Sequence, residues 1–173
     1  MIKINRQLKA AEPLTLSEVK NWLKVDGDAD DMTITAMISQ VRELVESYLG
    51  RCIANTTVTL QVSASVYVEP PYGPVDTIVS VKDADGNDVS YTWDGFTLNF
   101  SSPVISVTAG TPQNTVKTIV YESAGGSIPE GLKLGLLEVI AWLYESRGDE
   151  DKLTYMIYQN ANLQVYRQKI WFT

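Results

Sequence analysis

Apolar residues near the start of the chain recur with the period of an amphipathic helix. In residues 16–24, the apolar residues that fall on one side predict a short helix; they are Leu16, Val19, Trp22 and Leu23. Thr15 and Glu18 have the spacing of a capping box, in which each side chain bonds to the backbone of the other residue. We therefore expect the first helix to begin directly after Thr15.

A longer apolar pattern runs from Ile34 to Tyr48. Its apolar residues are spaced alternately four and three positions apart, and polar side chains occupy the other side. Gly50 follows the pattern, and glycine readily adopts the left-handed conformation found after helices. The sequence therefore predicts a second helix that ends at Gly50.

The acidic link between these helices, residues 26–31, allows two interpretations. A calcium-binding EF-hand loop requires glycine at its sixth position and glutamate at its twelfth. With Asp26 in the first position, Asp31 and Met37 occupy those two positions, so the loop lacks both. We therefore favour capping of the second helix by Asp28 or Asp30. Calcium binding by Asp26, Asp28 and Asp30 is the alternative.

From residue 56 the spacing of apolar residues changes to that of β-strands. Runs rich in Val, Thr, Ile and aromatic residues predict strands at residues 56–62, 76–83, 89–93, 96–100, 103–109 and 115–122. Asp94-Gly95 has the composition of a two-residue hairpin turn, and Asp85-Gly86 marks another turn. The prolines in residues 68–75 predict a rigid connector. We therefore expect the middle of the chain to be all β.

Helical spacing returns at residues 129–146. Ser127 and Glu130 have the spacing of a second capping box, and Pro129 suits the first turn of a helix. Apolar residues surround this helix on almost every side, so it requires cover from several directions. Gly135 indicates a close approach by another element, either of the same chain or of a neighbouring one.

The final stretch, residues 148–173, begins acidic and ends basic and aromatic. Its last residues include Tyr166, Arg167, Lys169, Trp171 and Phe172. One interpretation is a C-terminal strand or tail that packs on the chain's own core. The other is a docking segment, because aromatic residues and arginine are enriched among the residues that anchor protein interfaces.

Composition excludes several classes of function. The 173 residues include no histidine, the commonest acid–base catalyst and zinc ligand, and one cysteine, Cys52, which we expect to be buried. A net charge of −7 disfavours binding to nucleic-acid phosphates. No apolar run has the length of a signal peptide or a membrane span. The sequence thus predicts a soluble α+β protein, made in the cytoplasm, with no enzyme activity, metal or cofactor.

Acidic and aromatic side chains suggest two other functions that we disfavour. Carboxylates at residues 83–88 and 149–151 are of the type that glycosidases use as an acid–base pair, but such runs are more often solvated. A carbohydrate-binding platform on the β region would consist of four aromatic residues: Tyr72, Tyr91, Trp93 and Phe96. Packing of one face of the strands on a core explains the alternating aromatic positions more simply.

Four stretches in order resemble the head–tail connector, or head-completion adaptor, proteins of long-tailed bacteriophages and prophages. They are the first helix with its acidic link (14–31), the second helix with a Tyr-x-Gly-Arg-like end (32–53), the third helix (128–149) and the closing LQVYRQKIWF (163–172). The resemblance implies a small helical bundle of three main helices, built from residues 1–55 and 127–173. Residues 56–126 would then be a β insertion, larger than in many members.

The resemblance further implies a structural protein of the virion neck that takes part in head completion. Roughly a dozen copies would form a ring below the portal, extend the DNA channel without binding DNA specifically, and receive a stopper or tail-completion protein. It implies portal docking by Tyr166, Arg167, Trp171 and Phe172. We assign a subunit interface to Leu134, Gly135, Val139 and Trp142. The alternatives are a tail-completion protein, a transient assembly chaperone, or a carbohydrate-binding module on the β insertion.

Overall fold

The computed structural model describes residues 2–63, 66–100, 116–125, 128–146 and 150–167, with only the backbone of Glu150 and Asp151. The chain forms two units, each built from two separate segments. The β unit comprises Met1–Ala10 and Ala54–Gly125, and the helical unit comprises Ala11–Ile53 and Gly126–Thr173. Helices and antiparallel strands are thus segregated, which confirms the predicted α+β class.

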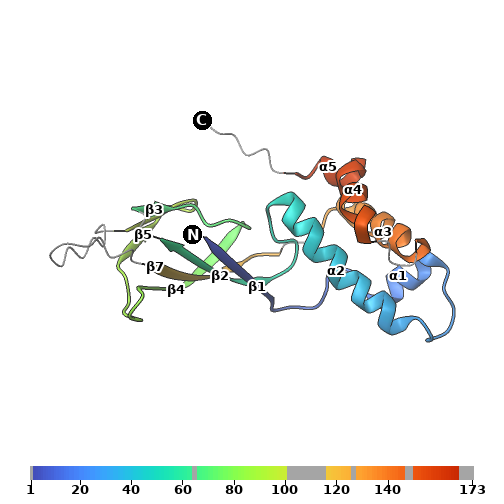
Figure 1. Cartoon of the computed structure of the whole chain (residues 1–173), viewed down its shortest axis with the longest axis horizontal. Coiled ribbons are helices and arrows are strands. Elements are labelled where there is room, and N and C mark those ends of the chain that lie inside the picture. Colours follow the sequence, from blue (N-terminus) through green and yellow to red (C-terminus); the bar gives the residue numbers. More distant parts are fainter. Residues whose placement is uncertain (1, 64–65, 101–115, 126–127, 147–149, 168–173) are drawn as a thin grey trace. The chain divides into compact units, whose positions relative to one another are not determined.

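The helical unit contains one apolar core to which distant segments of the chain contribute. Its helices, shown in Figure 1, are α1 (Leu16–Leu23), α2 (Asp31–Leu49), α3 (Glu130–Glu145), α4 (Glu150–Gln159) and α5 (Ala161–Gln164). Val45 of α2, Ile140 of α3 and Leu163 of α5 are all buried in this core. Within the described ranges, no helix has both the length and the apolarity needed to span a membrane.

The predicted start of the first helix and the predicted end of the second helix are confirmed. Thr15 and Glu18 form the capping box, with the Glu18 N–H donating to Thr15 Oγ1 at 3.2 Å and the Thr15 N–H donating to Glu18 Oε2 at 2.9 Å. Gly50 ends α2 with a φ of 69°, in the left-handed region that glycine adopts without strain.

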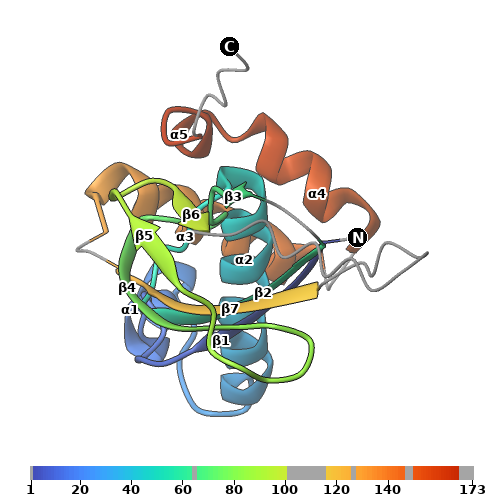
Figure 2. The same cartoon turned by 90° about the vertical axis from the view of Figure 1, so that its left-hand side faces the viewer.

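The third helix begins differently from the prediction. Pro129 occupies the N-cap position of α3 without a side-chain bond, and Ser127, the proposed capping residue, lies outside the described residues. Residues 150–159 and 161–164 form α4 and α5, coloured red in Figures 1 and 2, so the prediction of a C-terminal strand is wrong there, whereas packing on the chain's own core is confirmed. Leu153 and Ile157 are buried at helical spacing, which explains why a helix forms.

Two antiparallel sheets make up the β unit. The larger has the order β1-β2-β7-β4 and the smaller the order β3-β6-β5. The strands of the larger sheet are β1 (Lys3–Leu8), β2 (Thr56–Ser63), β4 (Val75–Lys82) and β7 (Val116–Ser123). Those of the smaller are β3 (Tyr67–Val68), β5 (Tyr91–Trp93) and β6 (Leu98–Phe100).

Strands β2 and β7 bury every second residue, as expected for one face packed on a core. Their register places Leu60 opposite Ile119 and Val58 opposite Tyr121, all on the buried face. The Tyr121 hydroxyl donates to the carbonyl of Pro71, which satisfies its polar end. The connector predicted from the prolines is thereby attached to the core.

The predicted hairpin is confirmed, since β5 and β6 pair on either side of Asp94-Gly95, but its loop spans the four residues 94–97 and not two. The Asp94 carboxylate accepts the N–H groups of Phe96 at 2.8 Å and Thr97 at 2.7 Å. The strand predicted at residues 103–109 lies outside the described residues.

The first ten residues belong to the β unit and not, as predicted, to the helical domain. Strand β1 pairs with β2 from Lys3 opposite Gln61 to Leu8 opposite Thr56. Its weak apolar pattern, in which only two of six residues are half-buried, explains why the sequence did not indicate a strand.

Candidate functional site

The acidic link has a different structural role from the one predicted. Asp30 occupies the N-cap position of α2, but its carboxylate accepts a hydrogen bond from the Tyr144 hydroxyl at 2.7 Å instead of capping the helix. This bond raises the pKa of Tyr144 above its ordinary value. Asp31 pairs with Lys20 at 2.5 Å. These contacts join the link to α1 and α3, so the prediction of side-chain capping is wrong.

A buried ionic cluster fixes the end of α2. Arg42 donates from Nη1 to Glu46 Oε2 at 3.2 Å and from Nε to Glu12 Oε2 at 2.7 Å. Glu46 is 0% exposed, and its other oxygen accepts the Ile53 N–H at 2.9 Å. The cluster therefore ties α2 to the segments on both sides of it within the helical unit.

The four residues assigned to a subunit interface divide into two pairs. Gly135 and Val139 are buried, and a Cβ built on Gly135 would lie 2.7 Å from Leu163 Cδ2. The close approach inferred at Gly135 is therefore made by α5 of the same chain, and Val139 is covered by the same core. Leu134 and Trp142 are half-buried and lie two turns apart on α3, so they retain surface for a neighbour.

The C-terminal segment is anchored to α3 before the described residues end. Glu138 accepts hydrogen bonds from the side chains of Asn160 at 2.8 Å and Asn162 at 3.0 Å. Tyr166 packs against the core, and its hydroxyl lies 2.8 Å from the position of a Cβ on Gly131. The final aromatic residues therefore follow a fixed point on the helical unit. Of the predicted docking residues, Trp171 and Phe172 lie outside the described residues.

Arg167 takes part in an aromatic cluster that the sequence did not indicate. The rings of Tyr48 and Tyr158 meet edge to face with centroids 4.8 Å apart. The Arg167 guanidinium lies 5.1 Å from the Tyr48 ring centroid and 5.8 Å from that of Tyr158. Tyr158 belongs to α4, the helix that was not predicted. The helical spacing of Leu153 and Ile157 is the sequence signal that could have indicated α4 and, with it, the position of Tyr158 in this cluster.

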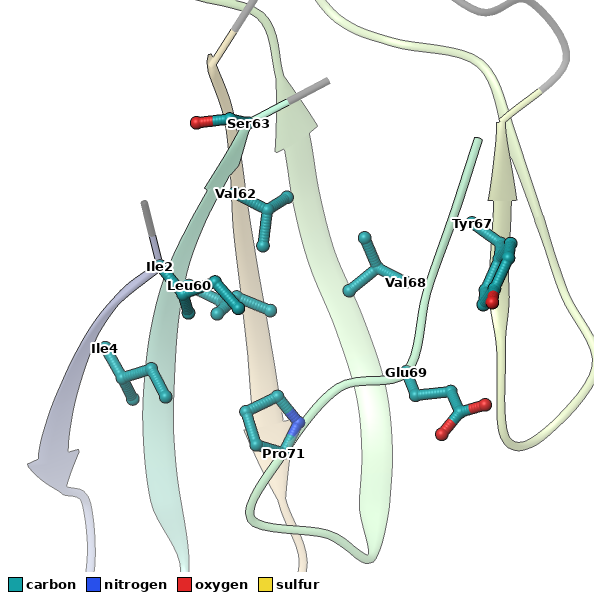
Figure 3. Close-up of a pocket in the computed structure, with 9 residues that line it drawn as sticks. All are labelled: Ile2, Ile4, Leu60, Val62, Ser63, Tyr67, Val68, Glu69 and Pro71. Carbon is teal, nitrogen blue, oxygen red and sulfur yellow. The ribbon is translucent and has the colours of Figure 1, made fainter. Parts of the chain in front are cut away.

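The β unit carries an apolar groove, shown in Figure 3. Its volume is about 410 Å³, and its lining residues come from β1, β2, β3 and the connector that follows β3. Ile2 and Ile4 line the β1 side, where they are 68% and 41% exposed. Leu60 and Val68, from β2 and β3, are buried. The groove is a surface for apolar contact and contains one carboxylate, that of Glu69.

The acidic groups considered for catalysis or metal binding have other structural roles where they are described. In the part of the chain that the structure describes, no three His, Cys, Asp or Glu side chains form a group suited to a metal ion. Asp83 stabilises its own turn, since hydrogen bonds from the backbone and side chain of Asn87 lower the pKa of its carboxyl group. The side chains of residues 149–151 lie outside the described residues. Cys52 is buried, as predicted.

The chain is similar to a known protein family and to solved structures. A family model described as head completion protein matches residues 12–154. The chain belongs to the head completion protein family. That match spans all of α1, α2 and α3, the helices on which the resemblance was based.

Two solved structures share the fold of this head completion family member. A chain from the neck of an empty gene transfer agent (GTA) particle computed with C6 symmetry matches with a TM-score of 0.71 and 14% identity, over 98% of this chain and 97% of that chain. A chain from the virion of the native GTA particle matches with a TM-score of 0.63 and 16% identity, over 98% and 97%. No curated protein matched. Family and fold together support a role in joining head and tail.

Proposed function

We propose that this chain is a structural head–tail connector whose copies form a ring below the portal. The observation that carries the proposal is the family match across residues 12–154, which includes the whole of the second and third helices. The fold shared with GTA neck and virion chains over 98% of the chain supports placement in the particle neck. In this role the ring extends the DNA channel and receives a stopper or tail-completion protein.

Charge supports passage of DNA without specific binding. The segments of the helical unit contain nine Lys and Arg residues against fourteen Asp and Glu residues. An acidic surface repels the phosphate backbone, so DNA is not retained on it. A role of this kind requires no reaction, and we propose that the protein is not an enzyme and uses no cofactor.

Contacts between copies are proposed at Leu134 and Trp142 of α3. Both side chains are half-buried within one chain and lie on the same side of the helix. A neighbouring copy that covers them would complete the burial of a helix that is apolar on almost every side. A ring requires contacts of this heterologous kind, in which different surfaces of the two copies meet.

Portal docking is proposed for the C-terminal segment, with Tyr166 and Arg167 at its base and Trp171 and Phe172 beyond. Tyr166 packs against the core, so it fixes the start of the segment. Aromatic residues and arginine dominate the binding energy of many interfaces. The segment is therefore suited to bind a separate protein while the helical unit remains folded.

Truncation after Arg167 tests the docking role. Truncations that also remove Leu163 are unsuitable, because this residue is fully buried in the core. We expect the truncated protein to melt as the full chain does but to lose binding to the portal ring, measured by mass photometry. The matched variant Trp171→Ala/Phe172→Ala should lose most of the binding, and Gln168→Ala should retain it. Unchanged binding by the truncated chain would contradict the docking role.

A further inference from the structure

Two opposite edges of the larger sheet carry opposite charge. The strand order places β1 at one edge and β4 at the other (Figure 3). Residues 1–10 contain three basic residues, Lys3, Arg6 and Lys9, and no acidic residue. Residues 75–88 contain one lysine and four aspartates: Asp76, Asp83, Asp85 and Asp88. The larger sheet is thus basic at β1, and the opposite edge is acidic at Asp76 of β4 and in the turn that follows β4.

The basic edge, defined as residues 2–6, combines exposed charge with exposed apolar surface. Lys3 and Asn5 are exposed on β1. The Arg6 guanidinium lies over the Tyr72 ring at 4.5 Å, which fixes its charge near the groove. Ile2 and Ile4 form the exposed wall of that groove. A partner for this edge should therefore supply both carboxylates and an apolar side chain.

The acidic edge, defined as residues 76–79 with Asp85, has this composition. Asp76 and Asp85 are exposed. Val79 lies between them in the sequence and is 54% exposed, so it adds apolar surface to this edge. The acidic edge therefore supplies carboxylates and an apolar side chain that match the requirements of the basic edge.

The geometry of β4 indicates that contact is made by side chains and not by a continued ladder of backbone hydrogen bonds. The register of β4 against β7 shifts twice, between Val75 and Thr77 and between Ile78 and Ser80. Such irregularities disrupt pairing at a sheet edge. The Val89 N–H also donates to the Val81 carbonyl at 2.9 Å, which occupies the end of the strand.

We propose that, in the ring, the basic edge of each copy binds the acidic edge of the next copy. This inference rests on the proposed ring and names the contact that the β units make within it. Because the basic and acidic edges are different surfaces, each copy presents its basic edge to one neighbour and its acidic edge to the other, as a closed ring requires. Opposite charges favour this head-to-tail orientation, and like charges disfavour contact between two identical edges.

Charge reversal at each edge tests the proposal. Lys3→Glu/Asn5→Glu makes both edges acidic, and Asp76→Lys/Asp85→Lys makes both edges basic. We expect each variant alone to assemble on the portal ring with an affinity at least about tenfold weaker than the unaltered protein. An equimolar mixture should recover assembly, because every contact then joins an acidic copy to a basic one. Native mass spectrometry counts both variants in each complex, and the expected composition is half of each.

A charge reversal elsewhere and the unaltered protein provide the controls. Asp26→Lys/Asp28→Lys changes two exposed residues of the acidic link by the same charge as Asp76→Lys/Asp85→Lys and should not affect assembly. Thermal melts confirm that the variants are folded. If the unaltered protein forms a ring and both edge variants do so equally well, the edge contact is wrong but the connector role stands. Impaired variants that a mixture does not rescue also overturn the edge contact. If the unaltered protein forms no ring, both proposals fail.

Discussion

The helical unit and the β unit depend on local sequence to different degrees. Helix α2 has its own apolar stripe and its own terminating glycine, Gly50, so its sequence predicts it without reference to any other element. Strand β1 has no such stripe, and it exists because six of its residues pair with β2. An edge strand of this kind is specified by its partner, which lies about fifty residues further along the chain.

The units also differ in how they bury charged side chains. In the helical unit, buried Arg42 and Glu46 neutralise each other and are hydrogen-bonded. In the β unit, buried Lys117 lies with its ammonium 4.0 Å from the centroid of the Phe100 ring. Burial lowers the pKa of Lys117. Removal of the Arg42 charge should therefore be strongly destabilising, because its ionic partner Glu46 remains buried.

The largest effect is expected from Arg42→Ala. The substitution leaves Glu46 buried without its cation, which should cost about 3–5 kcal/mol of unfolding free energy. Urea denaturation followed by circular dichroism measures this loss. Glu43→Gln removes a different partner of the same arginine, one whose side chain is 63% exposed, and should cost less than about 1 kcal/mol. Equal losses for the two variants would contradict a specific role for burial.

Deletion of residues 1–9 should destabilise the β unit without destabilising the helical unit. We expect hydrogen exchange of the β2 amides to accelerate about a hundredfold, because β2 loses its neighbour on one side. Exchange in α2 and α3 should change little, since these helices belong to the other unit. Lys3→Ala, which keeps the strand, is the control. Equal acceleration in α2 would show that β1 stabilises both units together.

Gly135→Ala should have an intermediate effect. Alanine favours a helix by about 1 kcal/mol over glycine, but the new Cβ would lie 2.7 Å from a methyl of buried Leu163. We expect the overlap to outweigh the gain, with a net loss of about 1–2 kcal/mol by urea denaturation. Adding Leu163→Val makes room and should recover part of the loss. Net stabilisation by Gly135→Ala alone would show that α5 adjusts freely.

The smallest effect concerns the capping box and depends on pH. Hydrogen bonds from Lys133 and then from Thr15 lower the pKa of Glu18 to about 2. Since this value lies below that of the unfolded chain, the ionised carboxylate contributes stability above the unfolded pKa, and the contribution is lost as the pH falls towards 2. The Glu18 side chain is 40% exposed, so solvent screening limits the contribution to about 1 kcal/mol.

Glu18→Gln tests this dependence. We expect the variant to be about 1 kcal/mol less stable than the unaltered protein at pH 7 and the difference to vanish near pH 2. Urea denaturation at a series of pH values measures it, with Glu145→Gln as an exposed control. A difference that is independent of pH would assign the effect to the lost helix cap alone.

Much of the fold is predictable from the sequence because its signals are local. The capping box at Thr15, the helix end at Gly50 and the hairpin at Asp94 all depend on residues within a few positions of one another. The actual role of Asp30 was not predictable, since its partner, Tyr144, lies 114 positions away. The same holds for Gly135, for which the sequence indicated a close approach but not that α5 makes it.

The candidate surfaces were predictable only in part. The apolar excess of α3 indicated an interface, but burial by α5 restricts the available residues to Leu134 and Trp142. The Arg167 cluster and the opposite edges of the larger sheet depend on pairing between distant segments. Such surfaces emerge only when the strand order and the helix neighbours are known.

Native mass spectrometry of the protein mixed with the portal ring of the same particle tests the central claim most directly. The account predicts a complex in which a fixed number of copies, roughly a dozen, binds each portal ring. Truncation after Arg167 should abolish this complex while leaving the chain folded. Failure of the full-length protein to bind the portal ring at any salt concentration would contradict the connector role.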